Sequence, residues 1–307
     1  MVTTLSSAAR MAGTVAMVGI GNMGFGMATR LLSLGWAVHV CDLNAQRCAD
    51  AAALGAHVHP RPAAAARALP PDGALLVAVV DAAECEQVMW GEDGAAAALT
   101  PGQTVIWCPT MAPADVEGLA ARLGAQGVHS LDAPMSGGPA RARDGSMSLL
   151  LAGPQAVVQQ HSALLQALSS QVFALGERVG DGARTKLVNN LLAGINLVGA
   201  AEALALADSL GLDGTRTLDV IDRSSGQSWI GADRMRRALA GDLAPRAHMT
   251  LLAKDTRLAC EAAQAVGFAG PLGDRVAAVF RMACDAGLSE LDDAAMLAFL
   301  QQRGQSR

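Results

Sequence analysis

The feature that most limits how this chain can fold is a long apolar segment near its middle. Between residues 187 and 206 nearly every residue is Leu, Ala, Val, Gly or Ile. The polar exceptions are Asn189, Asn190, Asn196 and Glu202. The length would suffice for a membrane span, but four polar side chains in about twenty residues argue against a lipid environment. We therefore expect a long helix that is buried on most of its faces inside a soluble protein.

Two polar residues near the start of this segment are the first candidates for function. Lys186 and Asn190 lie four residues apart, so they share one face of the predicted helix. A lysine in the first turn of a helix opposes the helix dipole, which weakens the alternative that Lys186 is an ordinary surface residue. A buried amine beside a buried amide requires a polar partner. We expect the rest of the chain to supply one.

A glycine-rich turn follows the first predicted strand, Thr14–Gly19, and leads into a helix predicted over Phe25–Leu34. The turn reads Gly19-Ile20-Gly21-Asn22-Met23-Gly24. In such a unit the first glycine permits the tight turn, the second lets a pyrophosphate approach the backbone, and the third lets helix and strand pack closely. In a chain rich in Ala and Gly, the motif alone leaves dinucleotide binding and chance equally open.

The next predicted strand, Ala37–Cys41, strengthens the case for a dinucleotide because it ends in Asp42. An acidic side chain at this place meets the ribose hydroxyls of NAD. No arginine directly follows Asp42, and Arg47 is the only nearby cation, so the 2′-phosphate of NADP would be repelled. The pattern favours NAD as the cofactor. The alternative is that Asp42 merely precedes a helix that begins near Asn44.

Strands and helices continue to alternate as far as residue 178. Further strands are predicted at Ala74–Val80, Gln103–Trp107, Val128–Leu131, Ser146–Ala152 and Val172–Leu175. Helices are predicted between them at 45–54, 82–90, 113–123 and 154–168. This α/β alternation predicts a Rossmann-type doubly wound parallel sheet over residues 1–178, with a ligand crevice at the carboxyl ends of the strands.

Beyond residue 180 the pattern is helical throughout. Helices are predicted at Ala183–Leu210, Thr215–Arg223, Ala232–Leu239, Met249–Val266, Gly273–Ala286 and Asp292–Gln302. Residues 179–307 are therefore predicted to form a second, all-helical domain for substrate binding and oligomerisation. One of these helices contains Lys254-Asp255, for which a solvated ion pair is the default interpretation.

Two of the predicted strands end in polar, turn-forming segments. They are Cys108-Pro109-Thr110 and Asp132-Ala133-Pro134-Met135-Ser136-Gly137-Gly138. The second segment is consistent with a simple loop, because Pro, Ser and Gly form turns. It is equally consistent with a carboxylate site, because a hydroxyl followed by two glycines exposes consecutive backbone N–H groups. Position alone leaves both interpretations open.

The composition excludes several classes of partner. The net charge is −5 and no basic stripe is visible, so we expect neither a nucleic-acid nor a membrane partner. The six cysteines form no CxxC pair and the six histidines form no constellation, which predicts reduced thiols and no metal site. Only Arg10 is charged before Thr14, and no apolar region precedes the first strand, so we expect no signal peptide and a cytoplasmic protein.

Together these motifs resemble the β-hydroxyacid dehydrogenase family, which includes 3-hydroxyisobutyrate dehydrogenase, tartronate semialdehyde reductase and L-threonate dehydrogenase. The resemblance spans nearly the full length. Its four ordered motifs are the glycine turn, the segment 132–138, the segment from Gly182 to Lys186 with Asn190, and Lys254-Asp255. It implies that Lys186 is the catalytic acid/base and that Asn190 and Ser136-Gly137-Gly138 hold the substrate. It also implies that Thr110 lies beside the nicotinamide and that Lys254 closes the site over the cofactor.

The resemblance narrows the expected reaction. Segments 79–83, 225–229 and 241–245 look most like the branch that acts on four-carbon sugar acids such as L-threonate or D-erythronate. We expect NAD-dependent oxidation of a small hydroxy acid, with Lys186 as base in oxidation and acid in reduction. The alternatives are an NADPH-dependent reductase of tartronate semialdehyde or a related aldehyde acid, a non-catalytic dinucleotide sensor, and an imine reductase. The apolar second domain predicts a homodimer or homotetramer.

Overall fold

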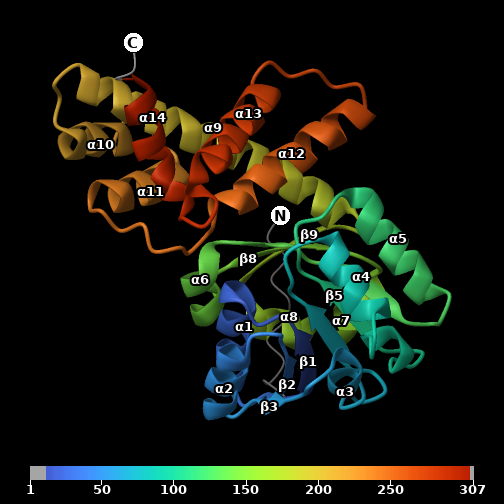
Figure 1. Ribbon diagram of the computed structural model, residues 1–307. Coiled ribbons are helices and arrows are strands. Elements are labelled where there is room, and N and C mark those ends of the chain that lie inside the picture. Colours follow the sequence, from blue (N-terminus) through green and yellow to red (C-terminus); the bar gives the residue numbers. More distant parts are fainter. Residues whose placement is uncertain (1–11, 305–307) are drawn as a thin grey trace. The chain divides into compact units, whose positions relative to one another are not determined.

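The computed structural model describes residues 12–304 of the 307-residue chain (Figure 1). The chain divides into two compact units, of which the first ends at Lys186 and the second begins at Leu187. The division falls inside one continuous helix, α9 (Asp181–Ser209), so the boundary expected after residue 178 stays a prediction. The segment in which we expect no signal peptide, residues 1–11, lies outside the described residues.

Nine strands of the described first unit form one sheet. They are β1 (Thr14–Val18), β2 (Ala37–Cys41), β3 (His57–Val58), β4 (Ala74–Val77), β5 (Thr104–Trp107), β6 (His129–Asp132), β7 (Met135–Ser136), β8 (Ser148–Ala152) and β9 (Gln171–Gly176). Their order is β3-β2-β1-β4-β5-β6-β8-β7, and β9 pairs with β8. All pairs from β3 to β6 are parallel, which confirms the predicted doubly wound α/β fold.

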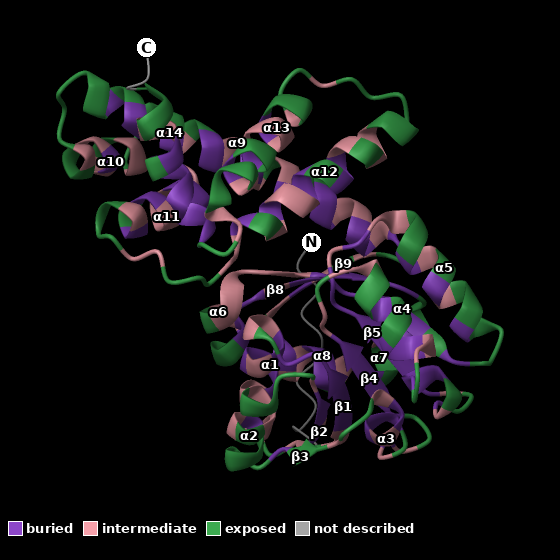
Figure 2. Cartoon of the chain, in the orientation of Figure 1, coloured by how far each residue is buried: buried purple, intermediate pink, exposed green. Residues whose placement is uncertain are grey.

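Helices cover both faces of this sheet, because successive side chains of each strand point to opposite sides. They are α1 (Asn22–Ser33), α2 (Ala45–Ala53), α3 (Pro62–Ala66), α4 (Ala82–Trp90), α5 (Pro113–Gly124), α6 (Gly138–Asp144), α7 (Gln155–Gln160) and α8 (Ser162–Leu168), with a 3-10 turn η1 (Ala95–Ala97). One face packs on α1, α2, α6, α7 and α8. The other packs on α3, α4, α5 and the start of α9. The central strands β1, β4 and β5 between these two layers are almost entirely buried, whereas β3 at the edge of the sheet is exposed (Figure 2).

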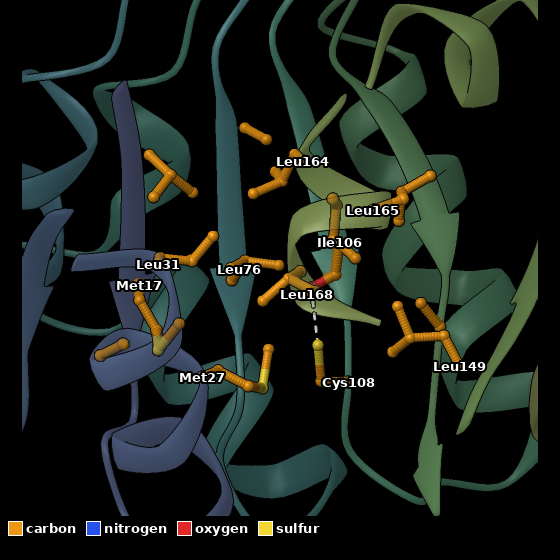
Figure 3. Packing of buried hydrophobic residues seen from close by; sticks show 14 of the residues in the cluster. Met17, Met27, Leu31, Leu76, Ile106, Cys108, Leu149, Leu164, Leu165 and Leu168 are labelled. Atoms are coloured by element: carbon orange, nitrogen blue, oxygen red, sulfur yellow. Dashed lines mark hydrogen bonds between the residues drawn. The ribbon is translucent and has the colours of Figure 1, made fainter. Parts of the chain in front are cut away.

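The first of these cores contains several methionines. Met17 of β1 and Met27 of α1 are fully buried, and Figure 3 shows them beside Leu76 of β4. Side chains of α8, including Leu164 and Leu168, close the same layer. A continuous apolar layer therefore fixes α1, and with it the glycine turn that precedes this helix.

Two features of the sheet differ from the prediction. Strand β8 runs antiparallel to β6 and to β7, whereas we expected parallel strands throughout. A buried apolar strand is compatible with parallel and with antiparallel pairing, so its sequence does not indicate the strand direction. The elements β3, β7, α3 and α6 were not predicted, because each has seven or fewer residues and thus too little periodicity to detect.

The described part of the second unit is helical, as predicted. After α9 come α10 (Gly214–Asp222), α11 (Trp229–Leu239), α12 (Met249–Ala265), α13 (Gly273–Ala283) and α14 (Met296–Gly304), with a π-helical turn η2 (Cys284–Leu288) and a 3-10 turn η3 (Asp293–Ala295). One apolar core joins these helices, with Leu197, Met235 and Phe280 fully buried in it. The only strand-like pairing in the described residues of this unit is an isolated bridge between His248 and Asp292.

The expectation that the long helix is buried on most of its faces was wrong. In its most apolar window only 44% of the residues are buried, and Val188, Leu192 and Leu206 are 71%, 57% and 59% exposed. A helix that is apolar all round gives no sequence signal for the face that its neighbours leave uncovered. Among the described helices, α9 alone has the length and hydropathy of a membrane span, but a core helix of a soluble protein meets the same two criteria.

Candidate active site

The glycine turn between β1 and α1 has the geometry of a phosphate-binding turn. Gly19 has φ +89°, which favours glycine, and a Cβ at Gly24 would lie 2.2 Å from the carbonyl oxygen of Gly19. Gly21 has no heavy atom within 4 Å of its missing Cβ, so the space in front of it is open. The first turn of α1 carries no acidic residue and no side-chain cap. Backbone N–H groups there remain directed at an incoming anion.

Asp42 joins this turn to the end of β2. Its Oδ2 accepts the Ile20 N–H at 2.6 Å and its Oδ1 accepts the Asn44 N–H at 2.7 Å. The residue that caps α2 is Asn44, whose side chain accepts from the Arg47 N–H, so Asp42 is not a helix cap. The Arg47 guanidinium donates to Asn22 Oδ1 at 2.8 Å. The open phosphate turn and the fixed carboxylate together fit a dinucleotide whose ribose hydroxyls meet Asp42.

The segment between β6 and α6 needs both of its glycines. Ser136 is half-buried at the end of the short strand β7, where it pairs with Ser148 of β8. Gly137 and Gly138 follow with φ +126° and +79°. Residues other than glycine rarely adopt a positive φ, so the two glycines permit a turn in which other residues would be strained.

Helix α6 holds this segment close to the nucleotide-binding end of the sheet. It packs directly on α1, where a Cβ at Gly26 would lie 2.9 Å from the carbonyl oxygen of Pro139 and 3.0 Å from Ala142 Cβ. The close approach of the two helices fixes Ser136 relative to the glycine turn. Thr110 lies half-buried just beyond β5, at the same edge of the parallel strands.

Lys186 is buried, with 8% of its surface exposed, which excludes the surface-lysine alternative. It is the sixth residue of α9 and the last residue of the first unit. Ion pairs stabilise the start of this helix, since Asp181 accepts from Arg178 at 2.6 Å and Arg184 donates to Glu117 at 2.7 Å. The amine therefore belongs to the same compact unit as the glycine turn and the Ser136 segment.

A buried carboxylate that sequence reasoning missed caps the start of α9. Asp132 ends β6 and is 1% exposed. Its Oδ2 accepts the Gly180 N–H at 3.0 Å and the Ala183 N–H at 2.8 Å, and the Gly182 N–H also interacts with it. Burial raises the pKa of Asp132 to about 6, although these backbone N–H groups lower it. The available signal was an acid at a strand end, four residues ahead of Ser136.

In the second unit Asn190 is held by two polar neighbours. Its Oδ1 accepts from Asn189 at 3.0 Å and its Nδ2 donates to Asp255 Oδ2 at 2.5 Å. Asn190 and Asp255 are 7% and 5% exposed. Asn190 Nδ2 keeps a second N–H that neither of these bonds uses. A substrate oxygen can accept from it without displacing Asp255.

The default interpretation of Lys254-Asp255 as a solvated ion pair was wrong. The Lys254 Nζ lies 3.0 Å from Asp255 Oδ1, and the two side chains are only 16% and 8% exposed. Asp255 Oδ1 has no hydrogen bond of good geometry, so the contact is electrostatic rather than a directed bond. Asp255 thus links the amide of Asn190 to the amine of Lys254 within one helical unit.

We expected no cluster of histidines, but three of the six lie side by side. His39 of β2 stacks on His57 with ring centroids 4.8 Å apart, and its Nδ1 lies 2.8 Å from Nε2 of His59. Burial and the neighbouring imidazoles lower the pKa of His39 and His59. Among residues 12–304 no group of three His, Cys, Asp or Glu side chains is arranged to hold a metal ion.

Ser228 and Trp229, from the segment 225–229 that resembles the branch acting on sugar acids, lie at the start of α11. Ser228 caps this helix by accepting the Gly231 N–H at 3.1 Å, and Trp229 is 58% exposed. Trp229 lines a shallow groove of about 440 Å³ within the second unit, together with Arg236, Arg237 and Arg246. All three arginines are paired with aspartates, so the groove does not offer unpaired positive charge.

Comparison with known proteins identifies similar chains over nearly the whole length. Residues 14–176 match the NAD binding domain of 6-phosphogluconate dehydrogenase, and residues 180–300 match the NAD-binding domain of NADP-dependent 3-hydroxyisobutyrate dehydrogenase. L-threonate dehydrogenase of Cupriavidus necator is 38% identical over 291 residues, which cover 94% of this chain and 96% of the relative. NAD-dependent L-serine dehydrogenase of Pseudomonas aeruginosa is 31% identical over 291 residues, which cover 91% of this chain and 94% of the relative.

A solved structure shows the same fold. The crystal structure of 3-hydroxyisobutyrate dehydrogenase from Salmonella typhimurium matches with a TM-score of 0.87 at 34% sequence identity. The match covers 93% of this chain and 99% of the other. The similarity therefore includes both the nucleotide-binding sheet and the helices that follow it.

Proposed function

Because the chain belongs to the β-hydroxyacid dehydrogenase family of NAD-binding oxidoreductases, which includes 3-hydroxyisobutyrate dehydrogenase, we propose that Lys186 transfers the proton in its reaction. The observation that carries this assignment is the burial of Lys186 in the unit that also holds the glycine turn and the Ser136 segment. A bound NAD supplies or accepts the hydride at its nicotinamide. The chain's own task is then to bind the hydroxy acid, orient its hydroxyl group and move one proton.

Lys186 performs the proton step in both directions. When the alcohol is oxidised, the neutral amine accepts the hydroxyl proton as a general base. When the carbonyl is reduced, the ammonium returns a proton to the carbonyl oxygen. Asn190, one helical turn further on, orients the reacting hydroxyl with the N–H that remains beyond its bond to Asp255.

The substrate carboxylate is held by the Ser136-Gly137-Gly138 turn in this proposal. The serine hydroxyl and the backbone N–H groups of two glycines in the left-handed region offer several donors to one anion. The resemblance to the family supports this assignment for the same three residues. We further propose that Thr110 and Lys254 contact the cofactor.

We propose a four-carbon sugar acid such as L-threonate as the substrate. The relative from C. necator bears that name and is 38% identical, and segments 79–83, 225–229 and 241–245 resemble the same branch. Among relatives of lower identity the names L-serine dehydrogenase and 3-hydroxyisobutyrate dehydrogenase occur, so these two acids are the natural competitors. The reduction of tartronate semialdehyde with NADPH is the alternative reaction.

A single kinetic series tests these proposals. Purified protein is mixed with NAD or NADP and with L-threonate, D-erythronate, L-serine or 3-hydroxyisobutyrate, and the absorbance of the reduced cofactor is followed. We expect the highest kcat/KM with L-threonate and NAD, because Asp42 repels a 2′-phosphate. Turnover only with NADPH and tartronate semialdehyde would replace this proposal with the alternative.

We also propose that the protein is a soluble cytoplasmic homodimer or homotetramer. The uncovered face of α9 supports an oligomer, because Val188, Leu192 and Leu206 form an apolar stripe that a second copy would bury. Val220 and Leu212 add exposed apolar surface in the same unit. Sedimentation velocity at micromolar concentration tests the proposal, and a monomer would contradict it.

A further inference from the structure

Asp132 stands at a junction of three strands and one helix. It is the last residue of β6, lies opposite Trp107 of β5 in the parallel ladder, and pairs with Ala152 of β8. The Ala133 N–H donates to the carbonyl oxygen of Trp107 at 2.8 Å, which fixes the backbone just beyond the carboxylate. The backbone of Asp132 is therefore held by strands on both of its sides.

From this junction the carboxylate reaches the start of α9. It accepts the N–H groups of Gly180 and Ala183, which lie 48 and 51 residues away in the sequence. Lys186 follows Ala183 by three residues, so it lies one turn further along the same side of the helix. The same aspartate begins the segment that leads to Ser136. One carboxylate thus connects the backbone on which Lys186 stands with the strand that carries the Ser136 turn.

Gly182 makes this contact possible. A Cβ at Gly182 would lie 2.9 Å from both Cγ and Oδ2 of Asp132, and 2.6 Å from the carbonyl oxygen of Leu150 in β8. Only glycine lets the backbone of α9 approach the sheet this closely. The close fit between Asp132 and Gly182 therefore restricts the position of the first helical turn.

Other helices of the chain are capped in a different way. Asn44, Asp81, Asp213 and Ser228 each accept an N–H only three residues further along the chain. Asp181 lies at the start of α9, but its Oδ1 accepts from Arg178 and Arg184. A local cap stabilises a helix without specifying where the helix lies, whereas a cap from a distant strand specifies its position. Burial of this carboxylate also raises its pKa to about 6, a cost that a local, exposed cap does not carry.

We propose that Asp132 is a positioning residue of the reaction, which holds the first turn of α9 against the end of β6 and so sets the place of the Lys186 amine. This inference rests on the proton-transfer role proposed for Lys186. Asp132 itself does not exchange a proton with the substrate. Its loss displaces the amine and leaves the NAD turn, which is built from β1, α1 and Asp42, in place.

A double-mutant cycle tests this inference. The kcat for NADH formation is measured with L-threonate, or with the acid that the kinetic series selects, for wild type, Asp132→Asn, Lys186→Ala and the double variant. Misplacement of a catalytic group by about 1 Å costs on the order of 100-fold, so we expect Asp132→Asn to lower kcat by about 10- to 100-fold. In the Lys186→Ala background the same change should lower the residual kcat by less than about 3-fold, because no amine remains to be positioned. The dissociation constant of NADH should stay within about 3-fold throughout.

The outcomes separate the two proposals. Equal losses in both backgrounds, or a normal kcat for Asp132→Asn, would overturn the positioning role while leaving Lys186 as the acid/base. Near-normal turnover of Lys186→Ala would overturn both. Gly182→Ala disturbs the same contact from the helix side and replaces Asp132→Asn in the cycle if that variant does not fold. Asp213→Asn, which alters the local cap of α10, is the matched control and should keep the wild-type kcat.

Discussion

Replacing Gly182 with alanine is expected to destabilise the protein by about 1–2 kcal/mol and to lower kcat as well. The added methyl group would lie 2.6 Å from the carbonyl oxygen of Leu150 and 2.9 Å from the carboxylate of Asp132, where ordinary contacts begin at 3.4 Å. Neither group can move freely, because both belong to the central sheet. Overpacking of this kind costs about 1–3 kcal/mol, and the better helix propensity of alanine offsets up to about 1 kcal/mol of it.

Gly118→Ala in α5 is the matched control for this substitution. Gly118 also lies inside a helix of the first unit, but it is exposed and no heavy atom lies within 4 Å of its missing Cβ. Helix propensity then acts alone and should stabilise the protein by up to about 1 kcal/mol. Urea unfolding of both variants measures the two free energies. If Gly182→Ala were as stable and as active as Gly118→Ala, the close contact between α9 and Asp132 would not exist in solution.

Three further predictions concern cofactor choice, pH and assembly. Asp42→Ala should lower the ratio of kcat/KM with NAD to that with NADP by about 10- to 100-fold, because a charge-assisted hydrogen bond to the ribose is lost; an unchanged ratio would remove Asp42 from cofactor recognition. The raised pKa of Asp132, about 6 in the folded state against 3.8 in the unfolded state, means that the folded protein binds this proton more tightly. The contribution of Asp132 to stability should therefore fall by up to about 3 kcal/mol as pH rises from about 4 to 6. Asp132→Asn should lack this slope in urea unfolding, and parallel pH curves would contradict the assignment. Leu192→Glu should dissociate the oligomer in sedimentation velocity, since it places a charge on the uncovered stripe of α9, and an unchanged sedimentation coefficient would place the interface elsewhere.

Local chemistry made the geometry of the glycine turn and of the neighbouring strand end predictable. Two glycines of the first turn are required by the backbone. Gly19 has φ +89°, and a Cβ at Gly24 would lie 2.2 Å from the carbonyl oxygen of Gly19. Asp42 was predictable because the end of β2 is set by the length of one strand, turn and helix unit. Gly137 and Gly138 lie in a segment whose Pro, Ser and Gly residues indicated a turn, and both have positive φ.

Contacts between residues far apart in the sequence were not predictable in this way. Asp132 accepts hydrogen bonds from residues 48 and 51 positions further along the chain, and Asn190 donates one to Asp255, 65 positions away. No periodic pattern in the sequence indicates either contact. The uncovered face of α9 escaped prediction for a related reason, because its sequence is apolar on every side. The antiparallel direction of β8 depends on how the chain turns between β6 and β8, not on the composition of the strand itself.

The measurement that tests the central claim most directly is the single-turnover rate of Lys186→Met with saturating NAD and hydroxy acid. Methionine retains most of the length and the apolar character of the lysine stem but can neither accept nor donate the proton. We expect the rate of NADH formation to fall by about 100- to 10,000-fold, the range typical for loss of a general acid/base, with an unchanged dissociation constant for NADH. A rate within about 3-fold of wild type would show that another group moves the proton, and would contradict the role of Lys186.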